Sequence, residues 1–283
     1  MSEPFPTPCF VLDLKRLRSN LETARHIRES AGCKILLATK AFALPAVFPL
    51  MRDYLDGTTA SGEQEARLGA DHFGKEVHVY SPAYAPGEVE RLSQVAQHIY
   101  FNSAAQIKRF GGVAKAAGAT LGLRVNPGFS NATLGGDLYD PCAPMSRFGE
   151  VPAKLQAVDW TAVDIFHVHA LCESLADGSV GLIEHVAQLF APYLDRVSTV
   201  NFGGGHFFKH IRHVGRSAGI QQSNIAIIPM RVDDAGMQLA RIDDQATARF
   251  EDDFDVKSRS EGSDRGDQRL DIIIRLVEEM TAA

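Results

Sequence analysis

The stretch that decides the fold is "KILLATKAF" at residues 34–42. Its first part, from Ile35 to Ala38, is a short apolar run of the kind found in a strand that is buried on both faces. Lys40 follows just past the carboxyl end of this run. Lysines often flank strands with their ammonium group in water and no chemical role. At the carboxyl end of a barrel strand, however, a lysine is well placed to form a Schiff base, so the rest of the chain must distinguish the two interpretations.

The composition indicates a globular chain whose partner is a small molecule. With 283 residues, of which 45% are hydrophobic, the chain can form one large domain or two ordinary ones. Its formal net charge of -6 and the lack of a long Lys/Arg run exclude a general attraction to nucleic acid or to an anionic membrane. No segment reaches the roughly 18 apolar residues that span a bilayer, and no secretory leader is recognisable, so we expect a cytoplasmic protein.

The cysteines predict neither a disulfide framework nor a zinc site. They are spread through the first two thirds of the chain without a CxxC pair, and no His/Cys cluster has zinc spacing. We therefore expect reduced thiols at the four positions, Cys9, Cys33, Cys142 and Cys172.

Short apolar runs alternate with longer helix-patterned segments from about residue 10 to residue 205. Such repeated βα units predict a parallel sheet, and seven strands are most simply a (β/α)8 barrel that is short of one strand. An open doubly wound sheet is the second choice. The expected strands are 34–38, 56–60, 76–80, 98–101, 120–125, 164–169 and 198–202, and the expected helices are 13–31, 62–71, 86–97, 103–117 and 179–195.

In a barrel, active groups are expected just after the strands, where the carboxyl ends meet. The residues of chemical interest do fall there: Lys40, Ser61, Glu63, Arg124, Asn126, His169 and the glycines 203–205. Ser61 could equally be an ordinary helix cap.

A glycine loop, "NFGGGHF" at 201–207, follows the last of these strands. Its backbone N–H groups could cradle a phosphate, although three glycines could also form a flexible turn. Together with Lys40 the loop indicates more, because a cofactor that carries both an aldehyde and a phosphate needs both features. That cofactor is pyridoxal phosphate.

Two histidines, His167 and His169, lie on one face of the strand in "FHVHALCES" at 166–174. A strand histidine is more often a satisfied core residue than a functional one. Because no third ligand is recognisable nearby, we predict no metal. A histidine ring at the end of the strand could instead stack on a flat aromatic cofactor.

Five segments together resemble carboxynorspermidine (carboxyspermidine) decarboxylase, a pyridoxal-phosphate enzyme of the group IV decarboxylases with the alanine racemase-type barrel. They are "ATKAF" at 38–42, "TTASGEQEARLG" at 58–69, "DLYDPCAPMSRFGE" at 137–150, "HVHALCES" at 167–174 and "NFGGGHF" at 201–207. The resemblance implies decarboxylation of carboxynorspermidine or carboxyspermidine to norspermidine or spermidine in polyamine biosynthesis. It also implies a homodimer.

The resemblance assigns roles to individual residues. Lys40 matches the lysine that holds the cofactor, His169 the histidine that stacks on its ring, and Gly203, Gly204 and Gly205 the phosphate-binding loop. Cys172 and Glu173 lie in the matching substrate-side segment, and Arg147 matches the basic residue of a Ser-Arg/Lys-x-Gly motif. We expect Cys172 to be catalytic together with Lys40 and His169, and Arg147 and Glu173 to bind the substrate.

The resemblance ends after about residue 208. The family has a Glu-Pro-Gly segment on the eighth barrel strand and a later β domain, and no "EPG" occurs in this chain. We therefore divide the chain into a leading segment at 1–33, a barrel at 34–208 and an atypical tail at 209–283, and our hypothesis is that the tail is frameshifted or weakly ordered. Ile225–Ile228 could replace the eighth strand, and 270–280 could form a terminal helix. Two alternatives stay open: an inactive cofactor-binding remnant, and an enzyme like diaminopimelate decarboxylase or an amino-acid racemase.

Overall fold

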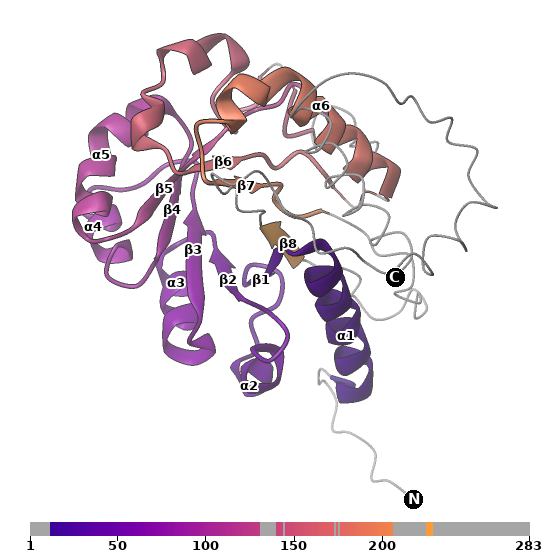
Figure 1. Cartoon of the computed structure of the whole chain (residues 1–283). Coiled ribbons are helices and arrows are strands. Elements are labelled where there is room, and N and C mark those ends of the chain that lie inside the picture. The colour runs from indigo at the N-terminus through magenta and orange to yellow at the C-terminus, as the bar shows by residue number, and fades with distance from the viewer. Residues whose placement is uncertain are drawn as a thin grey trace, which may run out of the picture.

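The computed structural model of the chain describes residues 12–130, 140–143, 145–172, 174, 176–205 and 225–228. Helices surround a curled sheet in this part of the chain (Figure 1). The strands are β1 (Lys34–Ala38), β2 (Gly57–Ala60), β3 (Glu76–Tyr80), β4 (His98–Phe101), β5 (Thr120–Arg124), β6 (Ile165–His167), β7 (Thr199–Asn201) and β8 (Ile225–Ile228). The α-helices are α1 (Leu14–Ala31), α2 (Phe48–Met51), α3 (Glu63–Leu68), α4 (Glu88–Leu92), α5 (Ala104–Ala116) and α6 (Ala176–Leu194). Short 3-10 helices span Pro45–Val47, Pro152–Ala157 and Trp160–Ala162, and a π-helix spans Gly69–Phe73.

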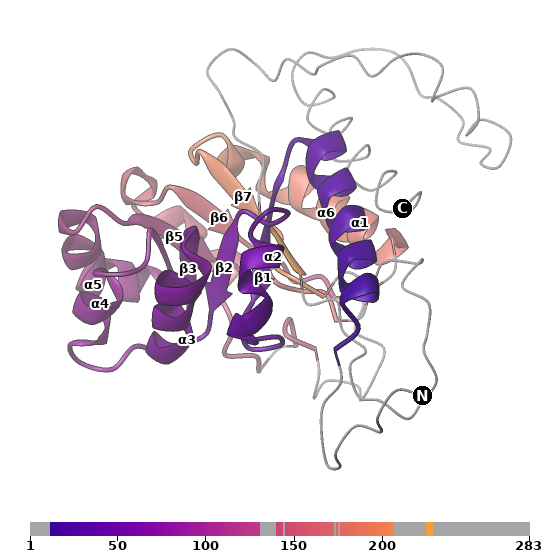
Figure 2. The same ribbon diagram turned by 90° about the horizontal axis from the view of Figure 1, so that it is seen from below.

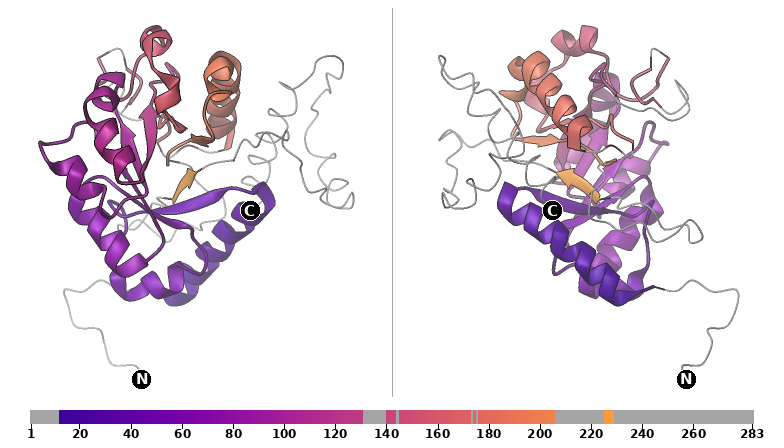
Figure 3. Two further views of the ribbon diagram at one scale, coloured as in Figure 1. Left: turned by 60° about the vertical axis from the view of Figure 1, so that its left-hand side comes forward. Right: turned by 90° about the vertical axis from the view of Figure 1, so that its right-hand side faces the viewer.

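The sheet has the strand order of a barrel. Strands β1 to β7 are adjacent in chain order and pair in parallel. Right-handed βα crossovers in an unbroken order put every helix on the same face of the sheet, and Figures 2 and 3 show the helices on its outer side. A doubly wound sheet would reverse its strand order in the middle. The barrel-type prediction is therefore confirmed, and the doubly wound alternative is wrong.

The strand at Ile225–Ile228 does not close the barrel as a parallel eighth strand would. It pairs with β1 in the antiparallel direction, with Lys34 opposite Ile228 and Leu37 opposite Ile225. It lies next to β7, but no hydrogen-bonded ladder joins the two strands. The described sheet therefore stays open between β7 and β8. The expected helix at 270–280 lies outside the described residues.

Helix α1 begins and ends where the sequence pattern predicts. The Asp13 side chain accepts the backbone N–H of Lys15 at 2.9 Å and so caps the amino end. Gly32, at a φ of 62°, ends the helix in the left-handed conformation that glycine adopts without strain. None of the helices in the described ranges is long and apolar enough to cross a membrane.

Two of the expected helices differ from their prediction. The segment 62–71 is not one regular helix, because α3 ends at Leu68 and the chain continues as the π-helix. Gly69 lies against β2 there: a methyl group on it would come within 2.2 Å of Thr58 Oγ1. This close approach of backbone to strand is a tertiary contact that the helical spacing does not reveal. Helix α4 is shorter than predicted and spans only Glu88–Leu92.

The sheet has an apolar outer face and a polar inner face. Outward side chains of the strands pack with the helices into one core, which includes Ile35, Val77, Ile99, Leu121 and Phe166. Each strand side chain alternates with a neighbour on the opposite face. The inner face carries polar residues that are also buried, namely His78, Tyr100, Arg124, His167 and Asn201.

A glycine makes room for the largest of these inward side chains. Tyr100 is 1% exposed, and a methyl group on Gly122, its partner across β4 and β5, would come within 2.2 Å of the Tyr100 ring. The phenol therefore lies flat over a strand position that has no side chain.

Candidate functional site

Lys40 lies in a tight turn just past β1, and its side chain is exposed. The turn is closed by the backbone N–H of Ala41, which donates to Ala38 O at 3.1 Å. The carboxylate of Glu65 also fixes this turn. Glu65 Oε2 lies 3.1 Å from the Thr39 hydroxyl and accepts the backbone N–H of Ser61 at 2.7 Å. One carboxylate therefore joins the loops that follow β1 and β2.

Ser61 and Glu63 have ordinary structural contacts. The residue before α3 is Gly62, and no side chain caps the helix. Glu63 accepts hydrogen bonds from Arg67 and Arg91, at 3.0 Å and 2.8 Å, on the outer side of the sheet. The acidic residue that reaches the Lys40 turn is therefore Glu65, which the sequence analysis did not single out. Its position four residues after Ser61, in the first turn of a helix, was the available signal.

The segment after β6 and the glycine loop after β7 lie against each other. The backbone N–H of Gly204 donates to His169 Nδ1 at 3.2 Å, and the backbone N–H of Ser174 donates to Gly205 O at 2.8 Å. A methyl group on Gly205 would come within 2.2 Å of Leu171 O. Because Gly205 also has a φ of 95°, no other residue fits there without strain.

The N–H groups of the loop are less available than the sequence suggests. Gly203 donates its N–H to Asn201 Oδ1 at 2.8 Å, and Gly204 donates to His169. Of the three glycines, only Gly205 has an N–H that makes no hydrogen bond to another described residue. The loop therefore has one backbone donor ready for an anion in this conformation.

Two arginines and a phenylalanine lie beside the carboxyl ends of β3 and β5. The guanidinium groups of Arg124 and Arg147 lie 4.7 Å and 5.2 Å from the ring centroid of Phe148. Arg124 also lies 4.7 Å from the Tyr80 ring and donates to His169 O at 3.0 Å. These cation–π contacts leave the positive charge of both arginines unneutralised.

Lys40, Arg124 and Arg147 form no ion pair with any carboxylate of the described residues. Burial lowers the pKa of Arg124, but a guanidinium does not lose its proton in a protein. Burial, then the charge of Arg124, and more weakly that of Lys40, lower the pKa of His167 to about 3. Both cations are thus close enough to act on the same imidazole. An uncompensated group of cations at this end of the strands favours an anionic ligand.

The remaining predicted site residues are placed only in part. Cys172 is exposed and lies next to Gly205, where a methyl group would come within 3.1 Å of its backbone nitrogen. Glu173 lies outside the described residues. His169 is held beside the glycine loop, as stated above, and its ring centroid lies 6.4 Å from that of His167.

The donors that pyridoxal phosphate needs are present. The cofactor is an aldehyde with a phosphate, so it needs an amine, cationic groups and a backbone donor, which Lys40, the two arginines and Gly205 supply. The fit also has a steric element: Gly203, at a φ of 72°, lies so close to His169 that a methyl group would come within 2.5 Å of Nδ1. The glycine loop is thereby held tightly against the histidine.

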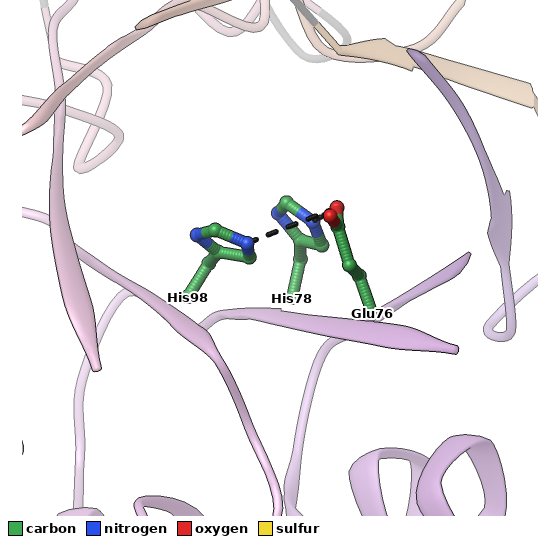
Figure 4. A group of neighbouring side chains, drawn as sticks. All are labelled: Glu76, His78 and His98. Carbon is green, nitrogen blue, oxygen red and sulfur yellow. Dashed lines mark hydrogen bonds and ion pairs between the residues drawn. The ribbon is translucent and has the colours of Figure 1, made fainter. Parts of the chain in front are cut away.

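A second polar group lies at the opposite, amino end of the strands. Glu76 and His78 on β3 and His98 on β4 point from the inner face of the sheet toward one another (Figure 4), and their ligand atoms lie within 4.8 Å of one another. These three residues are far along the chain from His167 and His169, the pair for which the sequence pattern offered no third metal ligand. Here, however, the Lys34 ammonium already binds Glu76, and His78 Nε2 lies 3.3 Å from the same carboxylate. A metal ion at this position would have to displace the Lys34 ammonium from Glu76 and break the contact between His78 Nε2 and the carboxylate.

No family model matches this chain. Curated relatives do match it, and they include decarboxylases. It is 37% identical over 204 residues to the carboxynorspermidine/carboxyspermidine decarboxylase of Campylobacter jejuni, and the match covers 72% of this chain and 52% of the relative. It is 41% identical over 204 residues to the carboxyaminopropylagmatine decarboxylase of Synechocystis, covering 71% of this chain and 51% of the relative. The chain thus spans about half the length of the curated relatives that it matches.

Solved structures agree with these relatives. The carboxynorspermidine decarboxylase of Campylobacter jejuni, complexed with norspermidine, superposes with a TM-score of 0.66 at 34% identity, over 74% of this chain and 54% of that one. A diaminopimelate decarboxylase from Helicobacter pylori, at a TM-score of 0.53 and 15% identity over 72% of this chain and 60% of that one, shares the fold alone. The part of the chain that these comparisons cover is therefore homologous to carboxynorspermidine/carboxyspermidine decarboxylases, as the sequence motifs predicted.

Proposed function

We propose that the protein binds pyridoxal phosphate on Lys40 and decarboxylates a carboxylated polyamine. The observation that carries this proposal is the group of three uncompensated cations, Lys40, Arg124 and Arg147, beside a glycine loop. A phosphate and a substrate carboxylate are the anions that such a group would bind. The reaction is that of the relatives that the chain matches.

When bound, pyridoxal phosphate supplies a conjugated ring that accepts the electron pair left by the departing carboxylate. The residues of the chain hold and orient the reactants. Lys40 provides the amine that holds the aldehyde carbon, and the loop at 203–205 holds the phosphate. The ring of His169 would pack against the cofactor, and the bond from Gly204 to its Nδ1, which holds the ring beside the glycine loop, supports this role. Its backbone carbonyl is tied in turn to Arg124.

On the substrate side, we assign carboxylate recognition to Arg147, contacts with the amine chain to Glu173, and a catalytic role to Cys172. Arg147 is exposed enough to meet an incoming anion, and its guanidinium lies on the Phe148 ring. Glu173 would attract the cationic amines of a polyamine by charge. Cys172 is an exposed thiol next to the glycine loop.

Two substrates follow from the relatives, and each has its own observation. Carboxynorspermidine or carboxyspermidine is favoured by the curated relative and the solved structure from Campylobacter jejuni. Carboxyaminopropylagmatine is favoured by the higher identity, 41%, to the Synechocystis protein. The two differ in the group at the far end of the chain, an amine against a guanidinium, so a direct comparison of turnover separates them.

The organisation of the chain is part of the proposal. We take 34–208 as the catalytic barrel, 1–33 as the segment leading into it and 209–283 as a separate tail. We further propose a homodimer in the cytoplasm, on the basis of the family resemblance. Light scattering of the full chain, with and without pyridoxal phosphate, would test the dimer: a mass near twice 30.8 kDa is expected.

The decisive experiment traps the cofactor and then follows turnover. The full chain with added pyridoxal phosphate should show the absorbance of the lysine-bound cofactor, and borohydride reduction with peptide mass spectrometry should place it on Lys40. Lys40→Ala should lose the signal, whereas Lys108→Ala, which changes an exposed lysine of α5, should keep it. Release of carbon dioxide is then measured with carboxynorspermidine, carboxyspermidine, carboxyaminopropylagmatine and diaminopimelate. Labelling without carbon dioxide release from any substrate would establish the cofactor-binding remnant, and no labelling of Lys40 would overturn the proposal.

A further inference from the structure

A continuous series of hydrogen bonds, buried except at its far end, crosses the inside of the barrel from the glycine loop to the opposite end of the strands. It begins at Asn201, the last residue of β7. Asn201 Oδ1 accepts the N–H of Gly203 at 2.8 Å. A backbone N–H can only donate, so this bond fixes which end of the amide is oxygen. Asn201 Nδ2 therefore donates to its other partner, the hydroxyl of Tyr100, at 3.1 Å.

The direction of the chain continues through Tyr100. Burial raises the pKa of this phenol, so its hydroxyl keeps its proton at neutral pH. The oxygen accepts from Asn201, and the single proton is available for His78 Nδ1, 2.9 Å away. His78 Nδ1 is therefore the acceptor, which leaves the ring proton of the neutral imidazole on Nε2.

The chain ends on a charged pair. His78 Nε2–H points to Glu76 Oε2 at 3.3 Å, and the Lys34 ammonium holds the other carboxylate oxygen. Every bond in the series thus has one consistent donor direction, from Gly203 to Glu76. Tyr100, His78 and Asn201 are 1%, 2% and 3% exposed, so water cannot readily replace a lost partner. A broken link would leave a buried polar atom unsatisfied.

This series of hydrogen bonds determines which N–H groups of the glycine loop are already bonded. Gly203 is buried and has a φ of 72°, and its N–H is turned inward to Asn201 rather than toward a ligand. With this N–H anchored, Gly204 bonds to His169, and Gly205 is the residue whose N–H is left over. Without Asn201, a buried N–H would lack an acceptor and the loop would have to change its course.

We propose that Asn201 and Tyr100, supported by His78, Glu76 and Lys34, are positioning residues that hold the glycine loop in the shape that receives the cofactor phosphate. The inference rests on the proposed function, since it concerns the same site. It also gives Glu76 and His78, two of the three residues in Figure 4, a role other than metal binding. A metal ion on His78 Nε2 would require the proton to move to Nδ1 and the Tyr100 hydroxyl to lose its acceptor.

The test compares pyridoxal phosphate with pyridoxal, which has the aldehyde but no phosphate. Dissociation constants of both are measured on the full chain from the absorbance of the lysine-bound aldehyde. The variants are Tyr100→Phe and Asn201→Ala, and the control is Thr120→Val, which changes the partner of His98 outside the chain of bonds. We expect Tyr100→Phe and Asn201→Ala to raise the dissociation constant of pyridoxal phosphate by about fivefold to tenfold, and to leave the dissociation constant of pyridoxal unchanged. Thr120→Val should change neither.

The outcomes distinguish a failure of this inference from a failure of the proposed function. If a variant binds pyridoxal phosphate and pyridoxal more weakly by the same factor, its residue has a general structural role and the inference is overturned. The inference is also overturned if Tyr100→Phe leaves the ratio of the two dissociation constants unchanged. Because Tyr100→Phe keeps the buried ring, it serves as the decisive variant if Asn201→Ala does not fold, which melting followed by circular dichroism would show. Absence of any Lys40-dependent signal in the unmodified protein would instead overturn the proposed function.

Discussion

Arg124 Nη2 donates a hydrogen bond to the backbone carbonyl of His169 at 3.0 Å, and this bond joins the carboxyl end of β5 to the segment after β6. It places a buried cation directly behind the histidine that we assign to the cofactor. The same guanidinium lies between the rings of Tyr80 and Phe148, 4.7 Å from each centroid, without a carboxylate partner among the described residues.

Replacing this arginine should separate ligand binding from stability. A buried charge without a counter-ion costs free energy in the ligand-free protein, so Arg124→Met should not lower the free energy of unfolding. The same change should weaken pyridoxal phosphate by about tenfold, which is roughly 1.4 kcal/mol, because it removes a cation from an anion site. The matched control is Arg109→Met, which changes an arginine stacked on Phe110 in α5. Equal binding by both variants would contradict the assignment.

The two acidic residues of α3 should behave differently. Glu65→Ala removes the carboxylate that fixes Thr39 and Ser61 beside the Lys40 turn, so attachment of pyridoxal phosphate to Lys40 should slow or weaken. Glu63→Ala removes bonds to Arg67 and Arg91 on the outside and should leave attachment unchanged. The rate and midpoint of the absorbance change measure both. If Glu63→Ala has the larger effect on attachment, the structural assignment of the two residues is wrong.

Two glycines with similar backbone angles should differ in their tolerance of alanine. Gly118 has a φ of 87° and open space around it, whereas Gly205 has a φ of 95° and Leu171 O in the path of a methyl group. Gly118→Ala should cost about 1 kcal/mol of unfolding free energy for the backbone conformation alone. Gly205→Ala should cost roughly 2 kcal/mol more, because a clash is added. Urea unfolding followed by fluorescence of Trp160, the one tryptophan, measures the difference.

Stability should fall as the solution is acidified from neutral pH. Burial lowers the pKa of His98 to about 3 from an ordinary value of 6.5, so between these values the unfolded chain binds a proton that the folded chain does not. The contribution is fully present above pH 6.5 and is lost as the pH falls toward 3, at about 1.4 kcal/mol per pH unit. The unfolding free energy of His98→Gln should therefore depend less on pH between 7 and 5.

The control for this slope is His72→Gln, because His72 is exposed. Measurements are kept above pH 5, since hydrogen bonds from His78 and Lys34, opposed by burial, lower the pKa of Glu76 to about 2 and add a second loss below pH 4.5. If His98→Gln leaves the pH dependence of the unfolding free energy unchanged, this histidine binds a proton as readily in the folded protein as in the unfolded chain, and the prediction is wrong.

The sequence by itself determined the seven parallel strands and the outer helices. Apolar runs such as Ile35–Ala38, with helix-patterned segments between them, can bury their side chains in few other ways, and β1 begins and ends as predicted. The sequence also placed Lys40 and the glycine loop at the same end of the sheet, because parallel strands share their carboxyl edge. Its motifs were sufficient to predict the homology to carboxynorspermidine/carboxyspermidine decarboxylases that the comparisons found.

Only the tertiary structure decided how the inner face is connected. The direction in which 225–228 pairs, the contact of Glu65 with the Lys40 turn, and the bonds from Asn201 through Tyr100 to His78 all join residues that are distant in the chain. Local spacing specifies which face a side chain takes, but not which partner it meets across the barrel. The physical reason is that a buried hydrogen bond depends on the position of two strands at once, and no single segment contains that information.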